Sequence, residues 1–180
     1  MKYSITYSSR TGNTERLAEA LREMFSEETR IYFGPLDDAA SHADMIFVGF
    51  WTDKGSCDED VKLFLKKLKY KTVFLFGTAG FGGSEEYFSK IMNSVRSNLD
   101  GSNCIAGSFM CQGRMPESVL RRYEKMLSEA SDPARIQHMI DNFHKASAHP
   151  DPGDLEGLKA EVQSAFSCQL KKGVVELQEK

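Results

Sequence analysis

The chain has little that would mark it as a metal-binding or disulfide-bonded protein. Its 180 residues include only four cysteines, Cys57, Cys104, Cys111 and Cys168, and no two of them form a C-x-x-C pair. Cysteines scattered in this way argue against a zinc site and against a secreted disulfide scaffold. The four histidines are also spread without the spacing of metal ligands. The sequence therefore predicts no metal site.

Long apolar runs and a strong net charge are missing too. No apolar stretch approaches the length that spans a membrane, and the chain begins in a predicted strand without a signal-peptide pattern. The formal net charge is only -3, which is too small and of the wrong sign for a dedicated nucleic-acid-binding protein. By elimination we expect a cytoplasmic protein that neither inserts into membranes nor binds nucleic acid.

The sequence does contain a regular alternation of strand and helix patterns. Continuous apolar segments predict strands that are covered on both faces, and segments with helical spacing separate them. The predicted strands are Lys2–Ser8, Arg30–Phe33, Met45–Trp51, Val73–Phe76 and Cys104–Cys111. Five strands with intervening helices predict an α/β fold with a doubly wound, five-stranded parallel sheet.

Residues 116–149 exceed what a five-stranded unit needs. Their apolar spacing predicts two helices, the second of which can begin at Pro133. The run His149-Pro150-Asp151-Pro152-Gly153 is a clear break, and a last helix follows it. We expect a single domain over residues 1–180, with residues 116–149 as an extra helical segment within it.

The most informative stretch lies between the first strand and the first helix. Its residues combine hydroxyl groups, a side-chain amide, a glycine and one cation: Ser9, Arg10, Thr11, Gly12, Asn13 and Thr14. A turn of this composition directs backbone N–H groups at one point, where the positive end of the helix dipole adds to them. The stretch therefore predicts a phosphate-binding loop. A capped helix start is the alternative, since the same residue types are common there.

Two competing phosphate motifs do not fit. A P-loop needs a Gly-Lys pair, and none follows this stretch. The run that begins at Gly80 starts like a dinucleotide fingerprint, but Glu85 stands where its last glycine belongs.

Two further loops follow the third and fourth predicted strands. In an open parallel sheet, ligands bind outside the carboxyl ends of the strands. Trp51, the only tryptophan, begins one loop, and Phe81 stands among glycines in the other. Two such rings across a gap would hold a flat, aromatic, phosphate-bearing ligand such as flavin mononucleotide (FMN). The alternatives are that Trp51 is a core residue and that Phe81 folds back onto the protein.

These loops resemble those of the flavodoxin family. The run Ser9-Arg10-Thr11-Gly12-Asn13-Thr14 matches the family's (Ser/Thr)-x-Thr-Gly-x-Thr phosphate loop at every defined position, and Phe76–Gly82 is similar to its second flavin loop. The run Trp51–Gly55 differs from the commonest first flavin loop. The resemblance covers Met1–Cys111 and, in outline, the last helix. It implies the strand order 2-1-3-4-5 and FMN as the cofactor.

The resemblance also implies a set of cofactor-binding residues in three loops. They are Ser9, Arg10, Thr11, Gly12, Asn13 and Thr14 in the phosphate loop, Trp51, Thr52, Asp53, Lys54 and Gly55 in the first flavin loop, and Thr78, Ala79, Gly80, Phe81, Gly82 and Gly83 in the second flavin loop. No catalytic residue is predicted. In the family, a peptide of the first flavin loop turns over on reduction, and Gly55 is the candidate here because glycine tolerates both conformations.

The implied function is an electron carrier rather than a stand-alone enzyme. It would shuttle electrons between redox partner proteins, a reductase or an oxidoreductase. The alternative is an FMN-dependent oxidoreductase that acts directly on a small molecule or a quinone, with residues 116–149 as a substrate wall. A signalling receiver on the same fold is disfavoured, because Tyr7-Ser8-Ser9 offers no carboxylate to phosphorylate.

Two local expectations concern the surroundings of the flavin loops. Asp58-Glu59-Asp60 and Glu85-Glu86 predict an acidic docking rim near the flavin edge, and the alternative is an ordinary solvated face. Ser56 is expected to cap the next helix, which would place Cys57 at a helix start where a thiolate is favoured. A redox role for Cys57 is one interpretation, and a packing or exposed thiol is the preferred one.

Overall fold

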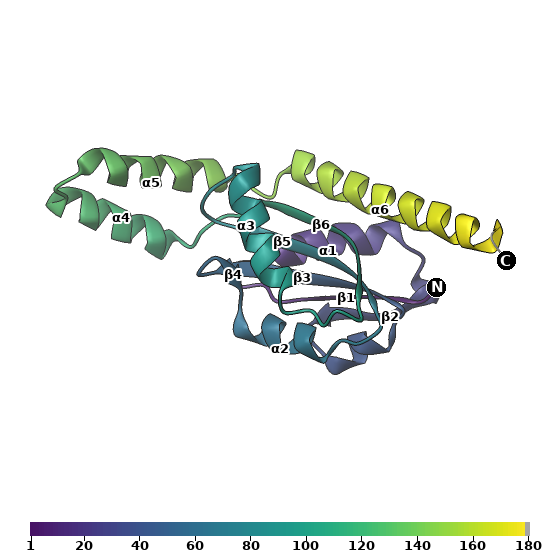
Figure 1. Ribbon diagram of the computed structural model, residues 1–180. Coiled ribbons are helices and arrows are strands. Elements are labelled where there is room, and N and C mark those ends of the chain that lie inside the picture. Colours follow the sequence, from purple (N-terminus) through teal and green to yellow (C-terminus); the bar gives the residue numbers. More distant parts are fainter. Residues whose placement is uncertain (179–180) are drawn as a thin grey trace.

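One parallel sheet organises the molecule, and helices cover both of its faces (Figure 1). The computed structural model describes the backbone of residues 1–178 and the side chains of residues 1–167. The long strands are β1 (Tyr3–Tyr7), β2 (Arg30–Pro35), β3 (Met45–Asp53), β5 (Thr72–Ala79) and β6 (Cys104–Gln112). Their order is β2-β1-β3-β5-β6, and all four pairings are parallel. Since β5 and β6 are the fourth and fifth long strands, the predicted order is confirmed.

Alternate residues of the central strands pack into two separate hydrophobic cores, one on each face of the sheet. On one face, Phe47 and Phe74 pack with α1 (Asn13–Met24) and α6 (Pro152–Gln178). On the other, Val48 and Leu75 pack with residues of α2 (Glu59–Lys67) and α3 (Glu85–Arg96). Burial on both faces explains why these strands read as continuous apolar runs.

Shorter elements complete this part of the chain. Two short 3-10 helices, η1 (Glu27–Thr29) and η2 (Asp38–His42), flank β2. A two-residue strand, β4 (Ser56–Cys57), pairs antiparallel with the end of β3 and makes a hairpin that the sequence did not predict. Within the described residues, no helix has both the length and the apolar character of a membrane span.

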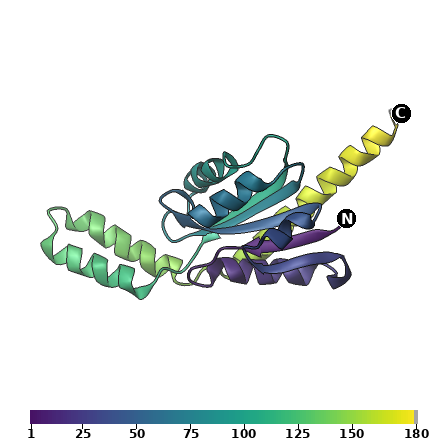
Figure 2. The same cartoon turned by 90° about the horizontal axis from the view of Figure 1, so that it is seen from below.

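A helical hairpin projects from the end of the sheet, as Figures 1 and 2 show. It consists of α4 (Glu117–Glu129) and α5 (Pro133–Ala146), the two helices expected within residues 116–149, and we call residues 117–146 the arm. The arm has its own small core around Tyr123, Ile136 and Ile140. As predicted, Pro133 stands at the start of the second helix.

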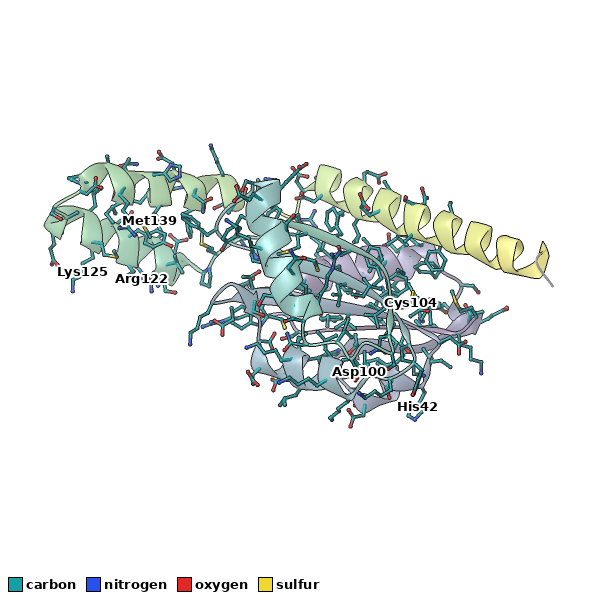
Figure 3. All side chains as sticks on the ribbon, viewed as in Figure 1. His42, Asp100, Cys104, Arg122, Lys125 and Met139 are labelled. Carbon is teal, nitrogen blue, oxygen red and sulfur yellow. The ribbon has the colours of Figure 1, made fainter. Side chains whose placement is uncertain are left out.

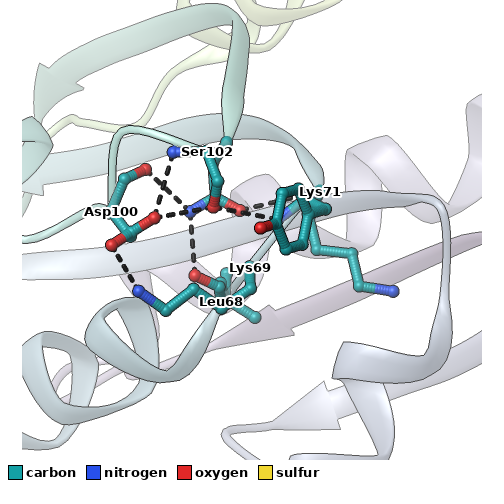
Figure 4. Close-up of polar contacts among 7 residues, drawn as sticks. Leu68, Lys69, Lys71, Asp100 and Ser102 are labelled. Atoms are coloured by element: carbon teal, nitrogen blue, oxygen red, sulfur yellow. Dashed lines mark hydrogen bonds and ion pairs between the residues drawn. The ribbon is translucent and has the colours of Figure 1, made fainter.

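The opposite end of the sheet is closed by a network of polar contacts (Figure 4). Asp100 pairs with Lys69, and its Oδ1 accepts hydrogen bonds from the Ser102 N–H at 3.0 Å and hydroxyl at 2.6 Å. The Lys69 ammonium and these bonds hold the pKa of Asp100 well below its usual range. The Asn103 amide donates a hydrogen bond to the Leu68 carbonyl and accepts one from the N–H of Lys71, the residue before β5. Side chains tie this end of the sheet together. The three predicted ligand loops lie at the other end, where the strands finish.

Candidate functional site

A cavity of about 660 Å³ opens at the carboxyl ends of the parallel strands. This volume suits a cofactor-sized ligand. Members of all three predicted loops line it: Arg10, Thr11 and Asn13, then Trp51, Thr52, Lys54 and Gly55, and then Thr78, Ala79, Gly80 and Phe81. Residues far apart in the sequence therefore meet at one place, the edge at which an open parallel sheet binds ligands.

The remaining predicted site residues do not line this cavity. They are Ser9, Gly12, Thr14, Asp53, Gly82 and Gly83. The Ser9 hydroxyl instead accepts a hydrogen bond of 3.3 Å from the N–H of Glu15. Thr14 is buried, and its hydroxyl donates to the Phe50 carbonyl at 3.2 Å. Thr14 thus fastens the loop to the sheet, because its only hydrogen is already committed.

The start of α1 favours the phosphate-loop interpretation over the capped-helix alternative. The N-cap residue is Gly12, with a φ of 81°, and it makes no side-chain cap; only the Ser9 hydroxyl accepts from one of the first N–H groups, that of Glu15. A non-glycine residue would be strained at this angle, which explains the glycine. A helix start with a glycine N-cap can present the N–H groups that Ser9 does not take, and the positive end of its dipole, to an anion.

The Asn13 side chain organises the donors of the phosphate loop. Its amide Nδ2 donates to the Thr11 hydroxyl and to the Arg114 carbonyl, both at 2.8 Å. Since Thr11 accepts this bond, its own hydrogen stays available for a phosphate oxygen. The contact also needs Gly113, because a Cβ there would stand 2.6 Å from Asn13 Nδ2. The donor set therefore fits the phosphate group of FMN.

Trp51 meets the phosphate loop through Arg10. The Arg10 guanidinium carbon lies 5.4 Å from the centroid of the Trp51 ring, which is a cation–π distance. Trp51 is half-buried and lines the cavity rather than the core. The contact links the first flavin loop to the phosphate loop, so that an aromatic ligand would meet Trp51 on the surface that Arg10 leaves free.

The first flavin loop is the turn of the unpredicted hairpin. Thr52 pairs with Cys57 and Asp53 with Ser56, which leaves Lys54 and Gly55 as the two turn residues. Their φ angles are 47° and 81°, the left-handed values that a tight hairpin turn of type I′ requires. Gly55 has open space around its Cα, in keeping with the conformational freedom expected of it.

The second flavin loop presents an uncovered ring. Phe81 lines the cavity and is 40% exposed, so the protein itself does not cover it. The loop is held by a residue of the arm, because the buried Asn142 of α5 donates a hydrogen bond of 3.0 Å to the Gly80 carbonyl. The Asn142 oxygen in turn accepts a bond of 3.1 Å from Gln112 at the end of β6.

One wall of the cavity was missed by sequence reasoning. It is contributed by α3, by the segment that leads into α4 and by α4 itself: Tyr87, Gly113, Arg114, Met115, Pro116, Ser118, Val119, Arg122 and Tyr123. Only the apolar spacing of α4 was visible in the sequence. It shows that a helix forms but not which side of it faces the sheet.

The carboxylates of the expected acidic rim do not line the cavity itself. Among the described residues, those lining it include Arg10, Lys54, Arg114 and Arg122 but no aspartate or glutamate. Asp58 instead caps α2, since its Oδ1 accepts a hydrogen bond of 3.3 Å from the Val61 N–H.

Two expectations about the neighbouring residues were wrong. Ser56 does not cap α2, because it belongs to β4 and Asp58 takes that role. Cys57 is therefore not at a helix start. It is fully buried, and burial raises the pKa of its thiol, which disfavours the thiolate. Cys111 is also buried in the core, and burial raises the pKa of its thiol strongly.

A larger cavity of about 840 Å³ lies on the other side of the phosphate loop. Ser8 and Ser9 line it, but so do four carboxylates, Glu15, Asp37, Asp38 and Asp60. Of these, Asp38 is paired with Lys67 at 3.0 Å. Carboxylates at this density would repel a phosphate, so this cavity is the poorer candidate for an anionic cofactor.

Comparison with known proteins agrees with this geometry. The flavodoxin domain model matches residues 4–163. The chain is 41% identical over 173 residues to the flavodoxin-like domain-containing protein BilS of Clostridium symbiosum (strain WAL-14163), with 86% of this chain and 90% of that protein covered. It is 33% identical over 159 residues to the protein of the same name from Clostridioides difficile (strain CD3), with the same coverage of 86% and 90%.

The solved structures that are similar to this chain share less sequence with it. A short-chain flavodoxin associated with a non-canonical PDU bacterial microcompartment gives a TM-score of 0.49 at 16% identity, covering 82% of this chain and 99% of that one. A flavoprotein in complex with FMN from Lactobacillus acidophilus NCFM gives a TM-score of 0.47 at 15% identity, covering 68% and 98%. The family match and the identity to the relatives decide the assignment: the chain belongs to the flavodoxin domain family.

Proposed function

We propose that the protein binds FMN in the 660 Å³ cavity and carries electrons between redox partner proteins. The observation that supports this most is the meeting of three loops from different strand ends. One offers the start of a helix whose N-cap is a glycine, and the other two offer Trp51 and Phe81. Membership of the flavodoxin domain family supports the same cofactor.

Each group of residues has a distinct role in this proposal. The first N–H groups of α1 and the Thr11 hydroxyl hold the phosphate, with Arg10 as the nearest cation of the loop. Trp51 and Phe81 exclude water from the ring and set its orientation. Bound FMN supplies one- and two-electron transfer, and the chain supplies binding, orientation and electrostatics.

A specific observation keeps a second function in view. Ser118, Val119, Arg122 and Tyr123 of α4 line the same cavity, so the arm adds a wall on one side of the flavin site. Such a wall suits an FMN-dependent oxidoreductase that holds a small substrate against the ring.

A single set of measurements tests both functions. Purified protein is titrated with FMN, and stoichiometric binding with a flavin absorbance band is expected. Reduced pyridine nucleotide and an artificial acceptor are then added, with and without a flavodoxin reductase. Turnover only in the presence of the reductase supports the carrier. Turnover without it favours the oxidoreductase, and a failure to bind FMN rejects both.

A further inference from the structure

The charges that line the cavity have one sign. Arg10, Lys54, Arg114 and Arg122 are all exposed and all line it, and none of them takes part in an ion pair within the described side chains. Asp53 is next to Lys54 in the chain, yet it does not line the cavity. Like charges gathered around one pocket repel each other and focus a positive potential into it.

Two of these cations belong to the phosphate side of the pocket. Arg10 is part of the phosphate loop itself. The Arg114 carbonyl accepts from Asn13, and its N–H donates to the His149 carbonyl at 3.0 Å, which places its backbone beside that loop. Arg114 also lines a small cavity of about 160 Å³ together with Gly12 and Arg16. One phosphate group accounts for this half of the charge.

The other two cations come from elements that do not belong to the phosphate loop. Lys54 stands at the tip of the β3–β4 hairpin, where its φ of 47° is unusual for a lysine. Asparagine, aspartate and glycine are the usual residues at such a turn, so this choice carries a conformational cost.

Arg122 reaches the cavity from the arm. It lies one turn beyond Ser118 on α4, and both residues line the cavity, so one side of the helix faces the pocket. The next residue, Tyr123, is buried in the core of the arm and fixes the rotation of α4. The Arg122 guanidinium carbon lies 5.6 Å from the centroid of the Tyr123 ring, which holds it at the wall. Since no ion pair within the described side chains involves Arg122, its hydrogen-bond donors can bind an anion.

We propose that Lys54 and Arg122 form an anion-binding subsite beside the flavin. It would hold the carboxylate or phosphate group of a second, apolar or aromatic molecule, whose body would lie against the Val119 and Tyr123 side of the cavity. This inference rests on the proposed FMN site, because the second molecule shares the cavity with the flavin. A guanidinium binds either kind of anion through paired hydrogen bonds.

The test uses FMN-saturated protein and three probes with one aromatic body. These are naphthalenecarboxylate, naphthyl phosphate and the neutral naphthalenecarboxamide, and calorimetry gives the affinity of each. At least one anion should bind about tenfold more tightly than the amide, as charge-assisted hydrogen bonds would provide. The preferred anion then identifies the kind of group that the subsite takes.

Two variants decide whether the named residues are responsible. The double variant Lys54→Gln with Arg122→Gln, measured after saturation with FMN, should bind the anions no better than the amide. Lys125→Gln is the matched control, since Lys125 is an exposed cation on the same helix that does not line the cavity (Figure 3). It should retain the full preference.

The outcomes separate this inference from the proposed function. Equal affinity for anions and amide in FMN-loaded protein, or a preference that survives in the double variant, would overturn the subsite while the flavin site stands. Protein that takes up no FMN at all would reject the proposed function instead. Melting curves show whether the variants remain folded, as expected for changes at exposed side chains.

Discussion

Asn142 of the arm donates a 3.0 Å hydrogen bond to the carbonyl of Gly80 in the second flavin loop. The loop and the arm are thereby connected by a buried amide that also accepts a bond from Gln112. Buried polar groups with both partners satisfied fix one arrangement of the elements around them. The position of Phe81 therefore depends on a helix that lies outside the five-stranded unit.

Replacing Asn142 should loosen the second flavin loop. Asn142→Ala removes both bonds and leaves partners unsatisfied, which we expect to cost about 1–3 kcal/mol of folding free energy. FMN affinity should fall severalfold, and hydrogen exchange at residues 80–83 should become faster. Gln137→Ala is the control, because Gln137 is exposed on the same helix. Unchanged exchange in residues 80–83 would show that the bond does not hold the loop.

The phosphate loop predicts unequal roles for its two buried or half-buried threonines. Thr11→Val removes a donor that is free for a phosphate oxygen, so FMN binding should weaken by about 1–3 kcal/mol. Riboflavin lacks the phosphate, and its affinity should hardly change. Thr14→Val instead breaks the bond to Phe50 and should lower stability as well. Ser89→Ala, at an exposed position of α3, serves as the control. A Thr11 variant with equal losses for FMN and riboflavin would argue against the phosphate contact.

Trp51 offers a direct optical test, since it is the only tryptophan. Its half-buried ring lines the cavity, so FMN should quench its fluorescence strongly through close contact. Arg10→Gln should preserve the quenching while removing the cation over the ring. Tryptophan emission that ignores saturating FMN would place the ring away from the ligand.

Thiol labelling should separate the cysteines by burial. Cys104 is exposed, whereas Cys57 and Cys111 are buried and burial raises the pKa of both thiols. At mildly alkaline pH their thiolate fraction stays low, and reagent reaches them only when the structure opens. In a Cys168→Ser background we therefore expect one fast-reacting thiol, which Cys104→Ser removes. Rapid labelling of Cys57 would contradict the buried hairpin.

The Tyr7–Glu15 pair predicts a loss of stability in strong alkali. Burial, reinforced by the 3.0 Å hydrogen bond to Glu15, raises the pKa of Tyr7 to about 12. In the unfolded chain the phenol ionises near pH 10, so its contribution is fully present below about pH 10 and is lost as the pH rises to about 12. Denaturant melts of Tyr7→Phe should show a shallower decline over this window. Tyr70→Phe, at a residue that is 86% exposed, should behave like the unchanged protein.

Much of the fold was predictable because the central strands are buried on both faces. Segments such as Met45–Trp51 read as unbroken apolar runs, and the helices between them dictate parallel pairing. The β3–β4 hairpin was not predicted, since a two-residue strand carries no periodicity. Its Lys54-Gly55 turn also lacks the Asn-Gly or Asp-Gly pair that usually signals such a turn.

The candidate site divides in the same way. The phosphate loop is a local motif, so it could be proposed from sequence alone, and three of its residues, Arg10, Thr11 and Asn13, line the cavity. The wall around Arg122 depends on the orientation of α4 relative to the sheet. Contacts between residues distant in sequence, such as Asn142 with Gly80, set that orientation. The role of Asp58 was hidden for a related reason: the sequence shows that Asp58 follows a flavin loop, but not that its carboxylate caps α2.

The separate core of the arm divides the pocket between two cooperative units. The three loops of the pocket extend from a sheet that has a large core on each face. The α4 wall instead depends on the small cluster around Tyr123 and Ile136. Small clusters open locally at lower free energy than a central sheet does. Gradual heating should therefore dismantle the pocket in order: a molecule held by the wall leaves first, the flavin second, and the sheet unfolds last.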